Sequence, residues 1–364
     1  MEKTKVFIDP TSRLLYSSYY IQGLYEVLGK ASVSFSSAYF SDLKRSAEDF
    51  SFAHYFAFVV KKPGLEPQKF VIDFCDPPDI HPIAYTWCDR YAKINFNKSE
   101  TEDIYLGKLI PIPPGFGIRI WSLWETVYTC GKNYLKARNR AIIGQKRFIK
   151  DYFQQWKRPL LKDYLNPSAE IDSRKKPYIF IIASLWTDKK SKETTNVQRK
   201  NFMDTVRQME CNFEGGFYAS PDHDLAPTYK DLLFFKPYST AAYLAKTKAS
   251  YLVFNTPAVH GCHGWKLAEY LAMGKAIIST PLLNDLVKPL KHEKEIHYVH
   301  QDKDLKNTLD RLFKDVPYKE SLEKEAKAYY NQHAAPKAVI NQMLQTPLPV
   351  DFLVKNQQNC PKIS

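Results

Sequence analysis

The chain has 364 residues, of which 44% are hydrophobic, and its formal net charge at pH 7 is +13. This length is enough for two α/β domains of ordinary size. No apolar run is long enough to cross a bilayer, since the longest covers only residues 178–186. The excess of cations divides nearly equally between the two halves, which excludes a single basic domain and favours anionic partners such as nucleotide diphosphates or lipid phosphates.

The six cysteines are scattered, and no pair has the spacing of a zinc site or a redox motif. The first residues lead into a short strand rather than an apolar signal segment. We therefore expect reduced thiols in a cytoplasmic protein that also works at the inner face of the membrane, without a bound metal.

The first half alternates short apolar runs with helical stretches, a pattern typical of a parallel α/β sheet. Strands are expected at 5–9, 31–35, 55–60, 69–73 and 108–112. Residues 121–156 are mainly helical in pattern. The polar stretch 166–177 is predicted to be an interdomain linker.

The second half restarts with an apolar run at 178–184 that suits a parallel strand covered on both faces. Further strands are expected at 213–219, 232–235, 251–254 and 276–279. The pattern predicts Rossmann-like domains at 1–168 and 177–345, a polar tail at 346–364, and last helices that cross back to the first domain.

Residues 251–281 form a strand, a loop, a helix from about 265 to 273 and a second strand. Gly274 stands where a helix-ending glycine belongs. In an open parallel sheet, ligands bind beyond the carboxyl ends of the strands, and a helix that starts there favours a phosphate. Gly261 and Gly264 allow close backbone approach.

Lys266 and Glu269 are three residues apart and share one face of this helix. A carboxylate one turn below a phosphate site suits the two hydroxyls of a ribose. The alternative is a solvated surface pair. His260 and His263 have no clear third ligand, so a metal site is not expected there.

The run from Trp265 to Ser279, WKLAEYLAMGKAIIS, resembles the signature of GT-B glycosyltransferases. With Pro281-Leu282 and Ile296 to Val299, the resemblance extends to bacterial capsule and surface-polysaccharide glycosyltransferases. It covers about residues 250–300, and it implies an α/β fold of two Rossmann-like domains that face each other across a cleft.

The resemblance also implies roles for individual residues. Glu269 matches the glutamate that binds the donor ribose, and Lys266 matches a basic residue near the diphosphate. The backbone from Gly261 to Gly264 matches the diphosphate-binding turn. A basic residue after the domain's first strand usually helps to hold the phosphates, and Arg199 is favoured among four candidates, the others being Lys189, Lys190 and Lys200. Tyr238 lies where the family often places a loop near the base of the nucleotide.

One departure from the family pattern concerns Gly261. Many retaining members carry a first glutamate eight positions before the second, and here that position is Gly261. The stereochemistry of transfer is therefore left open. No tightly bound cofactor is expected, the donor being a UDP- or GDP-linked sugar, and the transfer is expected to be independent of a metal.

An inverting transfer needs a carboxylate or imidazole that takes the proton of the acceptor hydroxyl. The candidates are Asp76, Asp79 and His81, which follow a predicted strand, with Asp9 as a further one. Asp and Pro are also ordinary turn residues, so this cluster could equally be structural.

Seven cations without an intervening acid lie at Lys132, Lys136, Arg138, Arg140, Lys146, Arg147 and Lys150. Four aromatic residues lie at the far end of this stretch, at Phe148, Tyr152, Phe153 and Trp156. The stretch 132–156 suits contact with an anionic membrane or a lipid phosphate, or else a solvated helix face. No motif supports nucleic acid as a partner.

These features together predict a glycosyltransferase. It would move a sugar from a nucleotide sugar to a saccharide or lipid-linked acceptor in surface-polysaccharide synthesis. The alternatives are a nucleotide-sugar epimerase on the same fold and a non-enzymatic basic protein that binds nucleic acid or membrane.

Overall fold

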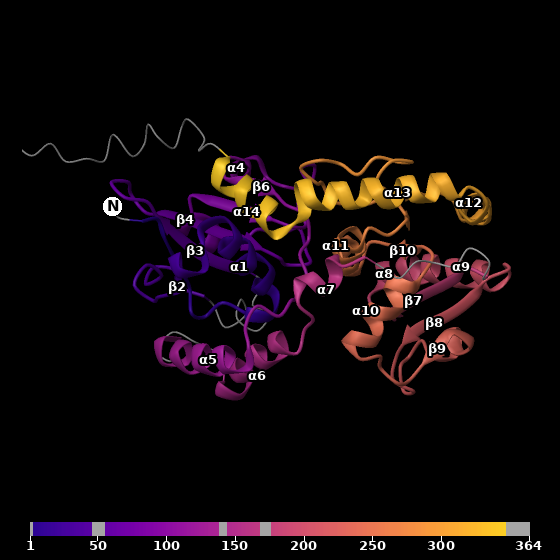
Figure 1. Ribbon diagram of the computed structural model, residues 1–364, viewed down its shortest axis with the longest axis horizontal. Coiled ribbons are helices and arrows are strands. Elements are labelled where there is room, and N and C mark those ends of the chain that lie inside the picture. The colour runs from indigo at the N-terminus through magenta and orange to yellow at the C-terminus, as the bar shows by residue number, and fades with distance from the viewer. Residues whose placement is uncertain (1–2, 46–54, 138–143, 168–175, 347–364) are drawn as a thin grey trace, which may run out of the picture. The chain divides into compact units, whose positions relative to one another are not determined.

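The chain divides into two compact units in the structure, a computed structural model that describes residues 3–45, 55–137, 144–167 and 176–346 (Figure 1). Unit 1 consists of residues 1–113, 117–157 and 336–364, and unit 2 of residues 114–116 and 158–335. The division at 157/158 precedes the predicted linker at 166–177, of which residues 168–175 lie outside the described part. The last helix is counted with unit 1.

Unit 1 contains a six-stranded sheet in the order β2-β1-β3-β4-β5-β6. Its strands are β1 (Lys5–Ile8), β2 (Val33–Phe35), β3 (Tyr55–Lys61), β4 (Gln68–Asp73), β5 (Arg90–Lys93) and β6 (Leu109–Pro111). β3 runs antiparallel to both β1 and β4, whereas the other neighbouring pairs are parallel. The predicted all-parallel sheet is therefore wrong at β3, because residues 62–67 are too few for a parallel crossover.

The helices of unit 1 are α1 (Leu14–Leu28), α3 (Pro82–Trp87), α4 (Asp103–Leu106), α5 (Leu123–Ala137), α6 (Gln145–Trp156) and α14 (Pro336–Gln345). α1 packs against α14 and α6. β3 is buried along its first six residues, and its side chains form a core with Phe40 and Trp87. That burial explains why its sequence, YFAFVV, is apolar without alternation.

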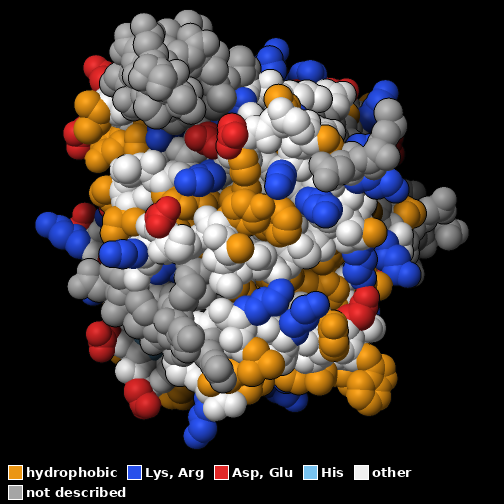
Figure 2. All heavy atoms as spheres, turned by 90° about the vertical axis from the view of Figure 1, so that its left-hand side faces the viewer, with side chains coloured by type: hydrophobic (Ala, Val, Ile, Leu, Met, Phe, Trp, Pro, Cys, Tyr) orange, Lys and Arg blue, Asp and Glu red, His pale blue; other side chains and the backbone are white. Residues whose placement is uncertain are grey.

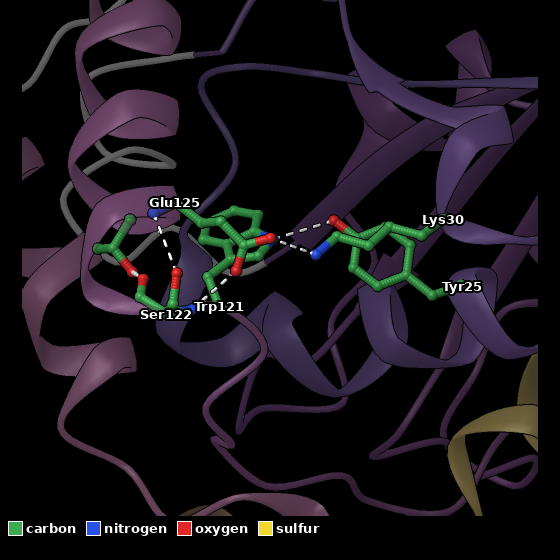
Figure 3. A network of polar contacts seen from close by, with 6 residues as sticks. Tyr25, Lys30, Trp121, Ser122 and Glu125 are labelled. Carbon is green, nitrogen blue, oxygen red and sulfur yellow. Dashed lines mark hydrogen bonds and ion pairs between the residues drawn. The ribbon is translucent and has the colours of Figure 1, made fainter.

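A reciprocal cap fixes the start of α5 (Figure 3). Glu125 N–H donates to Ser122 Oγ at 3.3 Å, while Ser122 N–H donates to Glu125 Oε2 at 2.8 Å. Lys30, just beyond α1, reaches the other oxygen of Glu125 at 2.5 Å, and Trp121 Nε1 donates to Tyr25 OH at 3.1 Å. This capping box anchors α5 to the end of α1.

Unit 2 contains two three-stranded parallel sheets, in the orders β7-β8-β9 and β10-β11-β12. Their strands are β7 (Tyr178–Ser184), β8 (Asn212–Tyr218), β9 (Leu233–Phe234), β10 (Val253–Asn255), β11 (Ile277–Ser279) and β12 (His297–Tyr298). β7 and β10 are neighbours, and Tyr251 N–H donates to Tyr178 O at 2.6 Å where they begin. The order is thus β9-β8-β7-β10-β11-β12, which confirms the predicted Rossmann-like α/β class.

The helices of unit 2 are α7 (Leu161–Leu165), α8 (Lys189–Glu193), α9 (Thr195–Arg207), α10 (Thr240–Ala249), α11 (Trp265–Met273), α12 (Asp302–Lys314) and α13 (Val316–Tyr329). α9 buries Phe202 against Phe254 of β10, with ring centroids 4.3 Å apart. The predicted helix 265–273 is confirmed, and Gly274 ends it in the left-handed conformation at φ 63°. No described helix is both long and apolar enough to span a membrane.

Gly215 generates a prediction about the close approach of β8 to β7. Its φ is +122°, and an added Cβ would lie 1.8 Å from Ile181 O. We expect Gly215→Ala to lower the free energy of unfolding by at least about 2 kcal/mol. Urea unfolding would measure this change. Gly107→Ala is the matched control, since its added Cβ meets nothing within 4 Å, and equal effects of the two substitutions would contradict the strained approach.

Candidate functional site

A cavity of about 170 Å³ lies at the carboxyl ends of β7 and β10 in unit 2. Its lining comes from residues 181–184, Trp186, Arg199, residues 254–256, Ala258 and residues 264–266. The chain leaves β7 toward β8 on one side and returns to β10 on the other, so this is the topological switch point of the sheet. Open α/β sheets bind their ligands at such points.

Two side chains at the start of α9 hold the loops around this cavity. Asn196 is fully buried, and it accepts from Trp186 N–H at 3.2 Å and donates to Trp186 O at 2.9 Å. Thr195 Oγ1 donates to Pro257 O at 3.1 Å. The loop after β7 and the loop after β10 are thereby attached to the same helix. Both residues were missed in the sequence, although the run Thr194-Thr195-Asn196 has the composition of a helix start.

Arg199 bridges the ends of β7 and β10. Its Nε donates to Thr256 Oγ1 at 2.9 Å, and its Nη1 donates to Ser184 O at 3.3 Å. Burial lowers the pKa of Arg199 to about 10, which leaves it charged at neutral pH. Arg199 was the favoured basic candidate, and the structure places it in the cavity wall. The other candidates, Lys189, Lys190 and Lys200, do not belong to the lining.

Lys266, the second residue of α11, supplies another cation to the same wall. Its ammonium donates to Ile182 O in β7. Burial lowers the pKa of Lys266 to about 7, and the nearby Arg199 lowers it further, whereas Glu269 raises it. Near neutral pH this ammonium is therefore only partly protonated, because the charge of Glu269 does not fully offset the effects of burial and of Arg199.

The start of α11 faces the same cavity. Gly264 is its N-cap, contributes no capping side chain, and lines the cavity. Gly261 lies in the preceding turn at φ +74°, where its carbonyl accepts from Asn284 Nδ2 at 3.0 Å. Gly261 itself does not belong to the lining, so of the two predicted glycines only Gly264 lies at the cavity wall.

Glu269 lies one turn further along α11 and is only 6% exposed. Tyr243 OH donates to its Oε2 at 2.8 Å, and burial raises the pKa of the carboxyl group. The alternative of a solvated surface pair with Lys266 is therefore wrong. Glu269 is close enough to stabilise the charge of Lys266 but does not belong to the cavity lining.

Tyr238 lies with a different group of residues. Its hydroxyl donates to Glu214 Oε1 at 2.9 Å, and Glu214 also accepts from Tyr178 and from Lys246. This cluster is at the beginning of β7 and β8, away from their carboxyl ends. The structure thus does not bring Tyr238 together with Arg199 and Lys266.

The two histidines of the loop before α11 have different surroundings. His260 is exposed, whereas His263 is 5% exposed and burial lowers its pKa to about 4. Among the described residues, the His, Cys, Asp and Glu side chains grouped closely enough for a metal ion are Asp73 with Cys75 and His81, and His292 with Glu293 and His297. Neither group includes His260 or His263.

The predicted base candidates lie in unit 1 beyond β4. Asp76 and Asp79 are exposed, and His81 is partly exposed at the start of α3. The residue that ends β4, Asp73, was missed as a polar centre. It is fully buried, and it accepts from Tyr91 OH at 2.5 Å and from Lys93 Nζ at 2.9 Å.

Asp9, the further base candidate, is held as a structural group. It is fully buried and accepts from Arg45 Nε and Nη2, both at 3.2 Å. The amide and hydroxyl of Thr11 donate to the same carboxylate at 3.1 and 2.7 Å. These hydrogen bonds use both oxygens of the Asp9 carboxylate to hold Arg45 and Thr11 in place.

No protein-family model and no curated protein sequence matches the chain. Solved structures that resemble it include glycosyltransferases. The C-terminal domain of a group 1 family glycosyl transferase from Francisella tularensis has 14% identity and a TM-score of 0.34, and covers 47% of this chain and 96% of that one.

Two other matches cover more of this chain. A glycosyltransferase from Rickettsia africae has 11% identity and a TM-score of 0.41, covering 74% of this chain and 64% of that one. HepE of Anabaena, in complex with UDP and glucose, has 11% identity and a TM-score of 0.43. The match covers 73% of this chain and 65% of the HepE chain. With TM-scores below 0.5, these likenesses do not assign the chain to a family.

The lowered pKa of Lys266 predicts how stability varies with pH. Between about pH 7 and its unfolded pKa of 10.5, the unfolded chain binds a proton at this site that the folded chain lacks. The free energy of unfolding should therefore rise with pH across this window, and this rise should be lost in Lys266→Met.

Urea unfolding of both proteins at pH 6.5, 8 and 9.5 would measure the difference. Lys275, whose pKa burial lowers to about 8, is present in both proteins, and its contribution cancels in the comparison. Parallel pH profiles for the two proteins would contradict the assignment.

Proposed function

We propose that the chain is a glycosyltransferase that takes its sugar from a UDP- or GDP-linked donor bound at the switch-point cavity of unit 2. The observation that carries this proposal is that cationic side chains and backbone hydrogen-bond donors converge on that cavity. Arg199, Lys266 and the start of α11 meet there, and none of the described lining residues is acidic. A diphosphate would supply the anionic charge that the wall lacks.

Trp186 adds a further donor to this wall. Its Nε1 is buried and has no hydrogen-bond partner among the described residues. An unpaired buried donor costs about 1–3 kcal/mol, so a phosphate or sugar oxygen that accepts from it would bind more tightly.

The chemistry proposed for this site is stabilisation of the leaving nucleoside diphosphate. Negative charge develops on the diphosphate as the bond to the sugar breaks, and preorganised cations and amide dipoles stabilise it. Arg199 is held in place by Ser184 and Thr256, so it is oriented before the donor binds. This arrangement supports a transfer that needs no metal.

Glu269 is proposed to accept hydrogen bonds from the donor ribose. Among the described residues, Tyr243 is the hydrogen-bond donor to its carboxylate, and it uses Oε2, so Oε1 is the oxygen for a ribose hydroxyl. Tyr238 is left out of the proposed donor site because it is bound to Glu214 at the opposite ends of the strands.

Unit 1 is proposed to bind the acceptor, a saccharide or lipid-linked saccharide of a surface polysaccharide. Asp76 and Asp79 are exposed and could reach a hydroxyl of a bound acceptor, and His81 follows in the same loop. These three remain the candidates for the general base if the transfer inverts the anomeric centre.

Contact with an anionic membrane is proposed through α5 rather than through Phe148 and Tyr152, two of the four predicted aromatic residues. Phe148 and Tyr152 are 3% and 1% exposed, so they belong to the core and their predicted surface role is wrong. Instead, α5 exposes large apolar side chains at Leu123, Trp124, Val127, Tyr128 and Leu135. Lys132 lies between them, and Figure 2 shows hydrophobic and basic side chains mixed on one face of the chain. Of the basic stretch, residues 138–143 lie outside the described part.

The donor site predicts the effects of two substitutions. UDP-glucose or a GDP-sugar should bind the full chain without added metal. Arg199→Ala should weaken that binding by roughly tenfold to a hundredfold, because a charge-assisted bond is lost. Glu269→Ala should also weaken donor binding, because the proposed hydrogen bonds from the ribose hydroxyls to Glu269 are lost. Isothermal titration calorimetry with a panel of UDP- and GDP-sugars measures both effects.

Glu214→Ala and Tyr238→Phe are the matched controls, and both should bind the donor normally. The affinity for UDP-glucose should fall as the pH rises through about 7, because free Lys266 loses its proton there. Lys266→Met should lack this dependence. Failure of every donor in the panel to bind would overturn the proposal.

The α5 surface predicts a loss of membrane affinity on substitution. Trp124→Ser with Tyr128→Ser should reduce co-sedimentation with phosphatidylglycerol vesicles roughly tenfold or more, because the apolar area that enters the interface is lost. Leu65→Ser, at a 62% exposed position outside α5, is the control. Unchanged sedimentation of the double variant would show that α5 does not contact the membrane.

A further inference from the structure

A second cavity, of about 410 Å³, lies within unit 1 beside the end of β1. The segment between β1 and α1 forms one side of it, and α6 forms another. Six of its lining residues carry the inference: Ser12, Arg13, Lys146, Arg147, Lys150 and Asp151. It shares no residue with the switch-point cavity of unit 2.

Hydrogen bonds to Asp9 fix the segment that carries Ser12. Arg45 binds the carboxylate of Asp9 through Nε and Nη2, and Asp9 in turn accepts from the amide and hydroxyl of Thr11. Ser12 N–H donates to Asp9 O at 3.0 Å. The backbone of Ser12 is therefore fixed before any ligand arrives.

The hydroxyl of Ser12 has no partner within the described part of the chain. Ser12 is 3% exposed, and its Oγ is buried without a hydrogen bond. A buried hydroxyl without a partner is unfavourable, and Ser12 lines the cavity. A ligand oxygen in the cavity would accept from this hydroxyl at little cost, because the backbone that carries it is already ordered.

The charges around the cavity are unequal. Lys146, Arg147 and Lys150 come from the first half of α6, and Arg13 comes from the residue before α1. Among the described lining residues, the acidic one is Asp151.

Asp151 is occupied by two partners in the protein. Its Oδ2 accepts from Leu14 N–H at 2.5 Å and so caps α1, and its Oδ1 lies 3.5 Å from Arg13 Nε. This carboxylate compensates Arg13, and among the described lining residues no other carboxylate faces Lys146 and Lys150 of α6.

We propose that this cavity binds the phosphate group of a phosphoester. A phosphate has three or four acceptor oxygens, which match a hydroxyl donor and several cations around one space. The volume exceeds that of inorganic phosphate, so the ester's organic part also has room. The site stands independently of the transferase activity, and it goes beyond it by giving unit 1 an anionic ligand.

The same chemistry can come from a soluble phosphoester or from a phosphate headgroup in a membrane. The competing explanation is that the cations of α6 are only a solvated helix face. Charge variants distinguish a phosphate site from a solvated helix face. If the cavity binds an anion, the affinity falls when a cation is removed and rises when the charge of Asp151 is removed.

The test uses the full chain carrying Arg199→Ala, so that phosphate binding at the unit 2 cavity is weakened. Inorganic phosphate and glycerol 1-phosphate are titrated by calorimetry. Lys150→Ala and Ser12→Ala should each weaken binding roughly threefold to tenfold. Asp151→Asn should strengthen it, since the amide oxygen can still cap α1. Lys132→Ala, an equal loss of charge on α5, should have little effect.

A second arm separates the two sources of phosphate. Vesicles of phosphatidylcholine with and without phosphatidic acid are sedimented with the same variants. Binding of the soluble esters assigns a soluble ligand, whereas Lys150-dependent binding of phosphatidic acid vesicles alone assigns a headgroup. No binding in either arm, or binding that is indifferent to Ser12, Lys150 and Asp151, would overturn the proposal. Thermal unfolding without ligand identifies any variant that fails to fold.

Discussion

The bridge that Arg199 makes between β7 and β10 is the interaction on which the proposed donor site depends. A guanidinium with two of its donors on Ser184 O and Thr256 Oγ1 fixes the spacing of the two strand ends. It also places a lasting positive charge beside Lys266, whose pKa falls to about 7 as a result of burial and of that neighbour. Two cations in one wall repel each other, so the folded chain without a ligand holds an electrostatic cost that a diphosphate would relieve.

Glu269 limits this cost without removing it. Its carboxylate is buried next to Tyr243, and it raises the pKa of Lys266 although burial and Arg199 act in the opposite direction. A carboxylate closer to Lys266 would form a full ion pair and compete with an anionic ligand. From its position one turn along α11, Glu269 offsets part of the fall in the pKa of Lys266, so the charge of Lys266 can respond to a bound phosphate.

The sequence predicted those parts of the structure that depend on local pattern. The unit from β10 to β11 was found because strand, loop, helix and glycine cap follow each other within about thirty residues. The sequence did not predict three other features, namely the antiparallel direction of β3, the burial of Phe148 and Tyr152, and the position of Tyr238 outside the cavity. Each depends on which distant element lies next to the residue. The roles of Asn196 and Asp151 were missed for the same reason, since Asp151 caps a helix that begins 137 residues earlier.

The two cavities use acidic residues differently, and the difference bears on what each can bind. At the end of β1, Asp9 neutralises Arg45 and Asp151 compensates Arg13, so the charge left over among the described lining residues is that of the exposed Lys146 and Lys150 on α6. At the end of β7, the charge left over belongs to Arg199 and Lys266, which are held by hydrogen bonds to β7. Rigid cations favour a ligand whose phosphates must be placed for reaction, because no side chain has to be ordered when charge develops. Cations on exposed side chains suit a group that needs only to be retained, which is what an acceptor's phosphate would require.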